Sequence, residues 1–486
     1  MSNNIIFDND LFLAIDQGGH ASRAIVFNHK GEVVAEAFQN IAVTHPESNR
    51  VEHDATELIA SIRTVITDVA RQLGDKVSRL TAAGLATQRS SIACWNKDTG
   101  EGLYPVISWQ DVRAHKWLQQ FKPHADHIHK KTGLFLSAHY GASKINWCLN
   151  NIKEVQAAQA DNNLCTGPMA SFIIYNLLEG QPYLADPGNA SRTQLWNIHT
   201  KTWDPELLAL FGVAENLLPK CVPSKHEFGM LNINDDIQIP LTLVTGDQSA
   251  AMYAYGKIQS ETAYINTGTG AFISRPSGYA LLFGRRLLTS IIYQQDEQAE
   301  YVLEGTVNGA GSAIDYMSKE LNVANVFSYL SDWLDTHYKK DFQQLFINGV
   351  SGLGAPFWIA DFPVKFSDES SNEEKFVAVV ESIIFLLQAS IEEMQKFASH
   401  PEQLQITGGL AQMDGLCQRL ADLSGLPVYR PVECEATARG LAYLLLNKPK
   451  KWPETKTGDW FKPDTSSEIS TRYKRWYACM LEEMRQ

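Results

Sequence analysis

The sequence predicts an α/β protein of two domains, and three observations support that prediction. Short apolar runs typical of strands alternate with segments of helical periodicity. A strand, a polar turn containing glycine and a second strand occur in succession twice, once in each half of the chain. The chain of 486 residues also exceeds the size at which a single hydrophobic core usually keeps growing.

The first half opens with a predicted β-hairpin. The apolar run Leu11–Ile15 leads into the polar turn Asp16-Gln17-Gly18-Gly19, and Ala24–Phe27 forms the returning strand. Further along we expect a third strand, a helix with one apolar face, and a buried strand that leads to Arg89, over Val33–Phe38, Ala55–Leu73 and Leu80–Ala86 respectively.

A related pattern begins near residue 240. The apolar run Leu241–Val244 ends in Thr245-Gly246-Asp247-Gln248, and a helix of small residues is expected over Ser249–Tyr255. Next, the strand Thr262–Ile265, the turn up to Gly270 and the strand Ala271–Ser274 form a second predicted hairpin. One such hairpin in each half suggests a duplicated fold.

We place the domain change near residue 250. The expected parts are an N-terminal domain over 1–250, a C-terminal domain over 251–455, and a tail helix within 456–486. Ser367–Glu374 is polar and predicts an exposed loop, and Trp452–Ser467 predicts an irregular connection to the tail helix.

The charge balance narrows the classes of partner. Lys and Arg number 42 against 55 Asp and Glu, a formal net charge of -13, and an acidic field repels nucleic acid. The N-terminus has acids where a signal peptide has basic residues, and polar residues interrupt every apolar run before it could span a membrane. We therefore expect a cytoplasmic protein without nucleic-acid partners or membrane insertion. The scattered cysteines fit reduced thiols: Cys94, Cys148, Cys165, Cys221, Cys417, Cys434 and Cys479.

The two glycine turns suggest phosphate chemistry. Gly18 and Gly19 directly follow a strand, where backbone N–H groups can approach an anion, and Asp16 just before them could hold Mg²⁺. Thr269 and Gly270 add a hydroxyl and a flexible backbone in the second turn. Each turn alone is better explained as an ordinary hairpin turn. Together they suggest phosphoryl transfer, which needs donors on both sides of a triphosphate.

For several other residues the sequence leaves two possible roles open. Asp247, at a strand end, is a candidate base for an attacking hydroxyl or a helix cap. Gly408-Gly409 precede a helix expected to start near Met413, and Gly311 opens another predicted helix; at both places the glycines could face a nucleotide or permit packing. Arg89 could donate to substrate hydroxyls or form a structural ion pair. His124, His127 and His129 invite a metal site, but the charged residues around them favour a solvated surface.

Taken together and in this order, the motifs resemble those of the FGGY carbohydrate kinases, closest to the glycerol kinase branch. They extend from Leu11 to about Leu445 and are, in chain order, Asp16-Gln17-Gly18 with Ser22-Arg23-Ala24, Thr87-Gln88-Arg89, Trp109-Gln110-Asp111, Lys131-Thr132-Gly133-Leu134, Lys144 with Trp147, Asn189-Ala190-Ser191-Arg192-Thr193, Asn197-Ile198-His199-Thr200, Gly246-Asp247-Gln248, Gly268-Thr269-Gly270, Gly352-Leu353-Gly354-Ala355-Pro356-Phe357-Trp358, Gly408-Gly409 and Glu435-Ala436-Thr437-Ala438.

The resemblance implies two actin-like, ribonuclease H-like ATPase domains with a central cleft that closes around the substrate. It implies a kinase that uses ATP and Mg²⁺ to phosphorylate a small polyol or sugar, with Asp247 as catalytic base and Asp16 as organiser of the metal. The implied substrate contacts are Arg89, Ser90, His139, Asp247 and Gln248. The implied nucleotide contacts are Gly18, Gly19, His20, Arg23, Thr269, Gly270, Gly311, Gly408, Gly409 and Met413. A homodimer or higher homo-oligomer is compatible with this picture.

The chain departs from the family pattern at five of these positions. Gly19 and His20 stand where the family usually has two threonines, and Ser90 stands where glycerol kinases have a glutamate. His139 aligns with a substrate-contacting tyrosine, and Met413 with an asparagine near the adenine. A larger polyol or a ketose therefore fits as well as glycerol. The alternative function is a catalytically weakened homologue that binds nucleotide or sugar and regulates another process; an actin- or chaperone-like ATPase ranks third.

Overall fold

The computed structural model describes residues 7–338, 340, 342–432, 435–453, 457–466 and 468–485. It divides into two compact units, each made of three segments of the chain. Unit 1 comprises Met1–Ile258, Ser290–Tyr301 and Cys434–Glu454, and unit 2 comprises Gln259–Thr289, Val302–Glu433 and Thr455–Gln486. The chain therefore passes between the units several times, whereas the sequence suggested one change near residue 250.

Unit 1 is built on a mixed sheet whose strands follow the order β17-β13-β14-β5-β1-β2-β3. The bounds are β1 Leu11–Gln17, β2 Ala21–Asn28, β3 Val33–Asn40, β5 Leu80–Thr87, β13 Lys225–Asn232, β14 Gln238–Gly246 and β17 Leu288–Gln295. The predicted strands of this unit are confirmed as β1, β2, β3, β5 and β14, and the first predicted hairpin is the pair β1–β2. β1 continues two residues further than expected, so that Asp16 and Gln17 lie in the strand and only Gly18, Gly19 and His20 form the turn.

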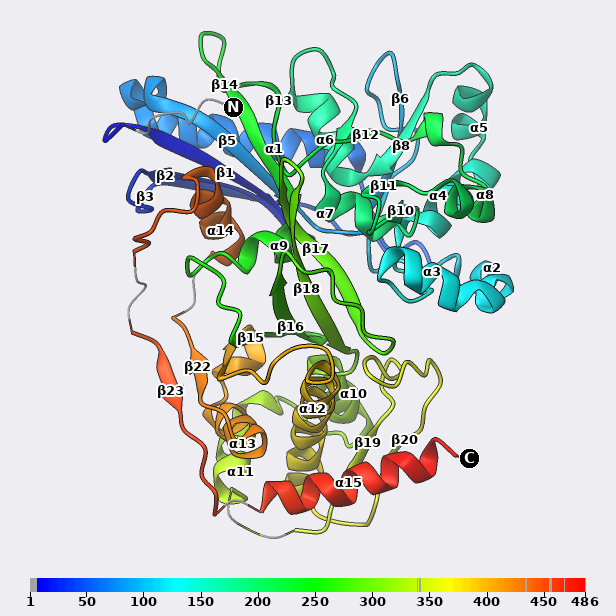
Figure 1. Ribbon diagram of the computed structural model, residues 1–486, viewed down its shortest axis with the longest axis vertical. Helices are drawn as coiled ribbons and strands as arrows, with labels where there is room; N and C mark the ends of the chain where they lie inside the picture. The colour runs from blue at the N-terminus through cyan, green and yellow to red at the C-terminus, as the bar shows by residue number, and fades with distance from the viewer. Residues whose placement is uncertain are drawn as a thin grey trace. The chain divides into compact units, whose positions relative to one another are not determined.

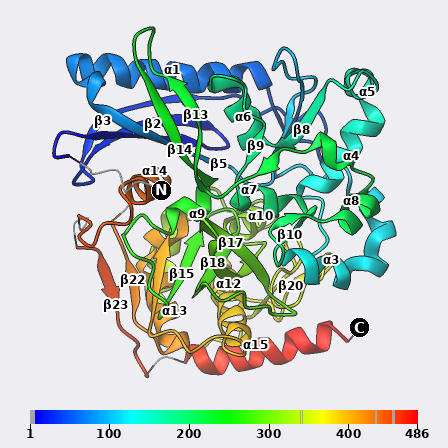
Figure 2. The same cartoon turned by 45° about the horizontal axis from the view of Figure 1, so that its top comes forward.

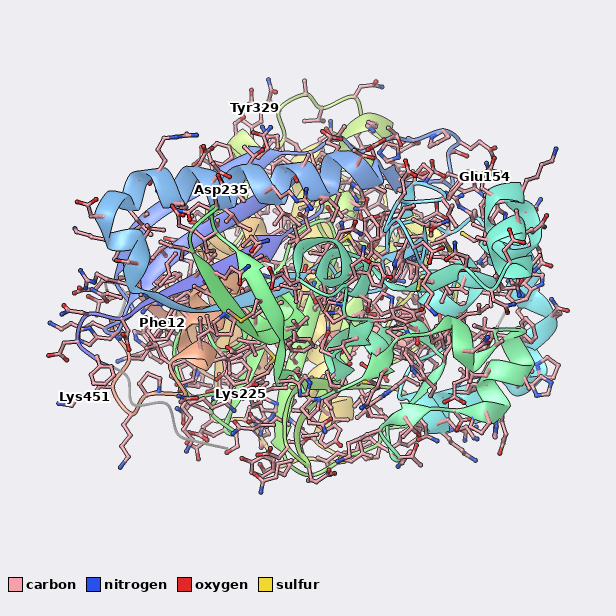
Figure 3. All side chains as sticks on the ribbon, turned by 90° about the horizontal axis from the view of Figure 1, so that it is seen from above. Phe12, Glu154, Lys225, Asp235, Tyr329 and Lys451 are labelled. Atoms are coloured by element: carbon pink, nitrogen blue, oxygen red, sulfur yellow. The ribbon has the colours of Figure 1, made fainter. Side chains whose placement is uncertain are left out.

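Helices cover both faces of this sheet. α1 (Ala55–Leu73), confirmed with the predicted bounds, packs on β2 and β3, and α14 (Ala436–Leu445) packs on β1 and β5. Figures 1 and 2 show the β1–β3 strands between these two helices. All seven residues of β1 are buried because both of its faces are covered. The β13–β14 hairpin has Asp235 at its turn and Lys225 at its opposite end (Figure 3).

The rest of unit 1 is a smaller sheet with helices around it. The strand order is β4-β7-β6-β8, with β4 Glu52–His53, β6 Ile92–Asn96, β7 Val106–Ile107 and β8 Leu164–Pro168. Two short pairs are β9 Leu184–Ala185 with β12 Lys220–Cys221, and β10 Trp196–Asn197 with β11 Thr202–Trp203. The helices are α2 His115–Leu118, α3 Ala125–Thr132, α4 Gly141–Asn151, α5 Lys153–Ala160, α6 Met169–Leu177, α7 Pro187–Ala190, α8 Pro205–Phe211 and α9 Asp247–Ala251.

Unit 2 repeats the combination of a sheet with covering helices. Its strands follow the order β23-β22-β21-β15-β16-β18, with β15 Thr262–Thr267, β16 Ala271–Gly278, β18 Gln298–Val307, β21 Gln403–Thr407, β22 Val428–Arg430 and β23 Asp459–Phe461. A separate pair joins β19 Phe346–Asn348 and β20 Val364–Phe366. The helices are α10 Gly311–Glu320, α11 Phe327–Thr336, α12 Asn372–Met394, α13 Asp414–Ser424 and α15 Ile469–Glu483.

α12 is the central helix of unit 2. Nearly every residue from Phe376 to Met394 is buried, as expected of a helix that is apolar on all sides. The last helix, α15, adds Tyr473 and Trp476 to the same core, and both rings pack on Phe385 of α12. The predicted tail helix therefore exists as α15 and belongs to the core of unit 2.

Three predicted segments differ from the structure. α9 begins at Asp247, two residues earlier than expected, and ends at Ala251. The loop expected over Ser367–Glu374 is wrong for its last three residues, because α12 begins at Asn372 behind a capping box of Ser371 and Glu374, a Ser-x-x-Glu signal that the sequence contained. The irregular connection Trp452–Ser467 contains the strand β23, although Ser467 itself lies outside the described residues.

Candidate functional site

The register of three parallel strands brings the first group of predicted site residues together in unit 1. Asp16 of β1 is level with Ala86 of β5, and Ala86 is level with Thr245 of β14. One residue further along, Gln17, Thr87 and Gly246 form the next row. Because adjacent strands lie about 4.8 Å apart, the residues that follow these rows emerge at one edge of the sheet.

Asp16 is a buried carboxylate with few partners. Its exposed fraction is 6%, and its Oδ1 is buried without a hydrogen-bond partner. Arg23 Nη1 lies 3.8 Å from Asp16 Oδ2 and 3.4 Å from Glu435 Oε2. Burial raises the pKa of Asp16 to about 7; the charge of Asp247 adds to this rise and the charge of Arg23 opposes it. The long ion pair with Arg23 therefore only partly offsets the effect of burial on this carboxylate.

Asp247 is the first residue of α9 and immediately follows β14. The alternative interpretation as a helix cap is not supported, because Gly246 occupies the N-cap position and no side chain caps this helix; Asp247 Oδ1 accepts the neighbouring backbone N–H of Gln248, at 2.7 Å. Burial raises the pKa of Asp247, while the charges of Arg89 and Arg192 lower it. A carboxylate with a raised pKa is a better proton acceptor once it is ionised.

Arg89 lies beside Asp247 and Gln248. Its Nη2 donates to Oε1 of Gln248 at 2.5 Å, and its charge acts on Asp247. The contact is close because residue 246 is glycine: a Cβ there would lie 2.5 Å from Cγ and Cδ of Arg89. Arg89, Asp247 and Gln248 thus form one cluster, as the substrate-binding interpretation requires.

Ser90 and His139 lie on either side of a buried ammonium group. Lys144 Nζ donates to the backbone carbonyls of Ser90, at 3.1 Å, and of His139, at 2.6 Å. Ser90 has a φ of 67°, in the left-handed region that serine rarely adopts. The ring of His139 is exposed, and its Nδ1 lies 3.1 Å from the carbonyl oxygen of Trp109.

The glycine turn of unit 1 contains the predicted phosphate contacts Gly18, Gly19 and His20, and it leaves open space at Gly19. Gly18 N–H donates to the carbonyl of Ala21 at 3.0 Å, which closes the turn. A Cβ at Gly19 would meet nothing within 4 Å, so glycine is not required there for steric reasons. His20 is exposed, and its backbone carbonyl accepts the N–H of Ile41.

The predicted nucleotide residues of unit 2 form a second group. The carbonyl of Thr269 accepts the N–H groups of Ala310 and Ser312, and Gly311 N–H donates to Gly268 at 2.9 Å. These bonds place the turn of the second hairpin against the start of α10. Gly408 has a φ of 96°, and a Cβ there would lie 2.2 Å from the carbonyl oxygen of Thr267.

For three predicted residues of unit 2, Gly409, Gly270 and Met413, the structure gives less support for contact with a ligand. A Cβ at Gly409 meets nothing within 4 Å, and one at Gly270 would lie 3.1 Å from the carbonyl oxygen of Val307. Met413 is 7% exposed and belongs to the hydrophobic core of the unit. Its side chain therefore packs against apolar neighbours.

The histidine cluster is not a metal site in the described part of the chain. His127 pairs with Glu206, whereas His129 is buried and stacks on Phe135 with ring centroids 4.1 Å apart. The interpretation as a solvated surface is wrong for His129. Among the described residues, no group of three or more His, Cys, Asp or Glu side chains could hold a metal ion. The six described cysteines are free thiols, and Cys434 lies outside the described residues.

Two buried cations, Arg192 and Lys144, lie near these residues, and the sequence alone indicated no role for either. Arg192 is 6% exposed, donates to Ser290 Oγ at 2.8 Å and lowers the pKa of Asp247. Lys144 is 1% exposed and contacts the backbone of both Ser90 and His139. Both residues lie in motifs that carried the family resemblance, but only the structure shows that their charges are buried beside the site.

Comparisons with known proteins match most of the chain. The family model for the N-terminal domain of the FGGY family of carbohydrate kinases matches residues 11–253, and the model for its C-terminal domain matches residues 263–446. The chain belongs to the FGGY family of carbohydrate kinases. This FGGY kinase is 34% identical over 443 residues to a glycerol kinase of Pseudothermotoga lettingae, covering 89% of this chain and 88% of the relative.

Two further similarities extend the comparison. A glycerol kinase of Synechocystis is 31% identical over 448 residues, covering 90% of each chain. The solved structure of Plasmodium falciparum glycerol kinase with ADP superposes with a TM-score of 0.88 at 24% identity, over 98% of this chain and 99% of that one. The predicted fold of two actin-like domains is confirmed, as is the predicted family.

Family membership makes this FGGY kinase a phosphotransferase with an alcohol group as acceptor, an ATP-dependent kinase of sugars or polyols. None of the helices that the structure describes is long and apolar enough to cross a membrane.

Proposed function

We propose that the protein transfers the γ-phosphoryl group of ATP to a hydroxyl of a small, uncharged polyol, with glycerol as the first acceptor to test. The observation that carries this proposal is the cluster at the carboxyl ends of β1, β5 and β14, where Asp16, Arg89 and Asp247 come together in unit 1. Glycerol is the first acceptor to test because two similar proteins, at 31% and 34% identity, are named glycerol kinases.

In this proposal Asp247 accepts the proton of the attacking hydroxyl. The acceptor oxygen forms a bond to the γ-phosphorus, the bond from that phosphorus to the bridging oxygen of ADP breaks, and the proton moves to the Asp247 carboxylate. Arg89 and Gln248, joined by their 2.5 Å contact, hold the remaining hydroxyls of the acceptor. The raised pKa of Asp247 supports this role, because a proton is then transferred to a more basic carboxylate.

The residues present also fit a hydrated Mg²⁺ ion. Magnesium is usually held by one or two carboxylates, several waters and substrate phosphates rather than by a full set of protein ligands. Asp16 provides one such carboxylate, and its buried Oδ1 has no hydrogen-bond partner within the protein. A divalent cation bound with ATP would supply the positive charge that this carboxylate lacks and would neutralise the phosphates.

Ser90 and His139 support an uncharged acceptor. The carbonyl of Trp109 can only accept a hydrogen bond, so Nδ1 of His139 carries the proton in that contact. In the neutral ring Nε2 is then free to accept a hydrogen bond from a hydroxyl. Ser90 offers a hydroxyl where glycerol kinases have a glutamate. Neutral groups at both positions suit hydroxyls along a polyol chain longer than glycerol as well as glycerol itself.

The test is ADP release in the presence of glycerol, erythritol, pentitols and ketopentoses. The proposal predicts turnover with at least one of these acceptors, and the variant Asp247→Asn should lower kcat by about 10²- to 10⁴-fold, the usual contribution of a general base. Asp235→Asn, at the exposed turn of the β13–β14 hairpin, is the matched control and should keep full activity. An Asp247→Asn variant as active as the wild type would refute the assignment.

The second candidate function is a regulator that binds ligand without turnover. It is favoured by Gly19 and His20, which leave the phosphate turn without two hydroxyl donors. Thermal stabilisation by ATP or by a polyol, with no ADP release for any acceptor of the panel, is the result that would select it over the kinase.

A further inference from the structure

The side chain of Lys144 is in an unusual environment for a cation. It is 1% exposed and lies in the first turn of α4, where the positive end of the helix dipole disfavours an ammonium group. In the described part of the chain no carboxylate forms an ion pair with it; its hydrogen-bond partners are the carbonyls of Ser90 and His139. Burial lowers its pKa to about 7, against the opposing charge of Asp111. A buried ammonium group without an ion pair is costly, so its hydrogen bonds are the interactions that stabilise it in this position.

The two carbonyls belong to two different segments. Ser90 lies in the turn after β5, next to Arg89, and His139 lies in the loop before α4. The start of α4 is itself fixed, because a Cβ at Gly141 would lie 2.7 Å from Ile92 Cδ1 and 3.1 Å from Thr193 Cα. Lys144 therefore ties both segments to a helix end that has little room to move.

Further hydrogen bonds close this arrangement into a ring. His139 Nδ1 contacts the carbonyl of Trp109 at 3.1 Å, and Trp109 N–H donates to Ser91 Oγ at 3.0 Å. Ser91 follows Ser90 directly, so that the ring returns to the carbonyl that Lys144 holds. The left-handed backbone of Ser90 lies within the ring, and a strained conformation persists only where its surroundings fix it.

We infer that Lys144 is a positioning residue for the acceptor: its ammonium group closes the ring that holds Ser90, His139 and, through the turn after β5, Arg89 in place. The inference rests on the proposed function, in which these three residues contact the acceptor. Lys144 itself touches neither substrate nor reacting atoms in this role. It differs from a purely structural lysine because its loss should weaken binding of the acceptor and leave binding of ATP unchanged.

The experiment compares Lys144→Met with the wild type in steady-state kinetics, using whichever acceptor of the polyol panel the wild type turns over. The expected result is a KM for the acceptor raised by about tenfold or more, with the KM for ATP within about twofold of the wild type, because only acceptor contacts lose their alignment. Lys131→Met is the matched control. It removes a lysine that pairs with Asp204 and Glu206 elsewhere in unit 1, and both KM values should stay unchanged.

A smaller change keeps the test decisive if Lys144→Met fails to fold. Ser91→Ala breaks the ring at the Trp109 N–H without disturbing the buried cation, and should raise the KM for the acceptor about threefold at an unchanged KM for ATP. Equal rises in both KM values, or no rise for the acceptor in either variant, would overturn the inference while leaving the kinase intact. A wild type that turns over no acceptor would instead refute the proposed function, and the inference with it.

Discussion

Two carboxylates of unit 1 stand out because burial works against their charge. Asp16 has a pKa raised to about 7, and the pKa of Asp247 is also raised, mainly because both have lost water. In Asp16 one oxygen also lacks any hydrogen bond. A side chain that serves only the fold would usually be neutralised by a partner or replaced by an apolar residue. Burying these two carboxylates costs folding free energy, and a bound cation or substrate that interacts with them would offset that cost.

Replacing Asp16 by asparagine should make folding stability less dependent on pH. The folded carboxyl titrates near pH 7, whereas the unfolded one titrates near 3.8, so the folded state retains a proton that the unfolded chain releases. Stability from this group is complete below about pH 4 and is lost as the pH rises to about 7. In metal-free buffer, the free energy of unfolding of the wild type should therefore fall by about 2–3 kcal/mol relative to that of Asp16→Asn as the pH rises from 5 to 8.

Thermal unfolding of both proteins across that pH range, in the presence of a chelator, provides the measurement. Asp235→Asn serves as the control, since its side chain is exposed and its removal should leave the pH dependence unchanged. Parallel stability curves for the wild type and Asp16→Asn would contradict the prediction.

Gly19 allows a gain-of-function test at the phosphate turn. A Cβ at this position would meet nothing within 4 Å, so a larger residue can be accommodated. Gly19→Thr restores one of the hydroxyls of the family pattern and should lower the KM for ATP by about two- to tenfold, the effect of one additional hydrogen bond. Gly19→Ala adds the Cβ alone and should leave the KM for ATP nearly unchanged. A similar effect of both substitutions would show that the hydroxyl is not responsible.

At the scale of elements, the last helix is held by charge as well as by apolar packing. Glu381 of α12 is 1% exposed and accepts from Arg472 of α15, at 2.6 and 2.9 Å, and from Arg419 of α13, at 3.2 Å. Both arginines are fully buried. The acid therefore joins three helices, and the two arginines explain how a charged residue is accommodated in the buried part of α12.

Removing this acid should destabilise unit 2 strongly. Glu381→Gln leaves two buried guanidinium groups without their common counter-charge, and we expect a loss of about 3–5 kcal/mol of stability. Calorimetric unfolding of the variant should show a clearly lower transition temperature. Glu369→Gln is the control, because Glu369 is nearly fully exposed beside Lys375 and its removal should have little effect. Equal transition temperatures for the two variants would contradict the role of Glu381.

At the scale of the whole molecule, neither unit is one continuous stretch of chain. Unit 1 needs Ser290–Tyr301, which contains most of β17, and Cys434–Glu454, which contains α14. Leu441 and Leu444 of α14 are buried, and Leu445 packs on Gly84 of β5. The face of the sheet that α14 covers would be exposed to water if the chain ended at Ile258.

A fragment of residues 1–258 should therefore fail to reach the native state of unit 1. We expect strong binding of a hydrophobic dye and weak near-ultraviolet circular dichroism, because an apolar face of the sheet stays uncovered. Co-expression with residues 259–486 supplies the missing segments and should restore the native spectrum. A 1–258 fragment that unfolds cooperatively on its own would show that α14 and β17 are dispensable.

Much of the local structure could be predicted without coordinates. Apolar periodicity fixed α1 at Ala55–Leu73, and the glycine turns marked both hairpins, because these signals depend only on neighbouring residues. The candidate residues at strand ends were found in the same way: Asp247 follows an apolar run, and Arg89 follows another. The limits of this approach appear at Asp16, whose place inside β1 depends on pairing with β2 and β5.

By itself, the sequence determined the fold class, the order of the main strands and helices, and the family. Only the tertiary structure decided which charges are buried and what they contact. Three examples are the hydrogen bond from Lys144 to the carbonyl of Ser90, the packing of Met413 in a core, and the contact of Glu381 with two arginines. Each of them joins segments that are far apart in the chain. The physical reason is that desolvation and electrostatic interaction depend on the surroundings in space, which a linear pattern of residues does not specify.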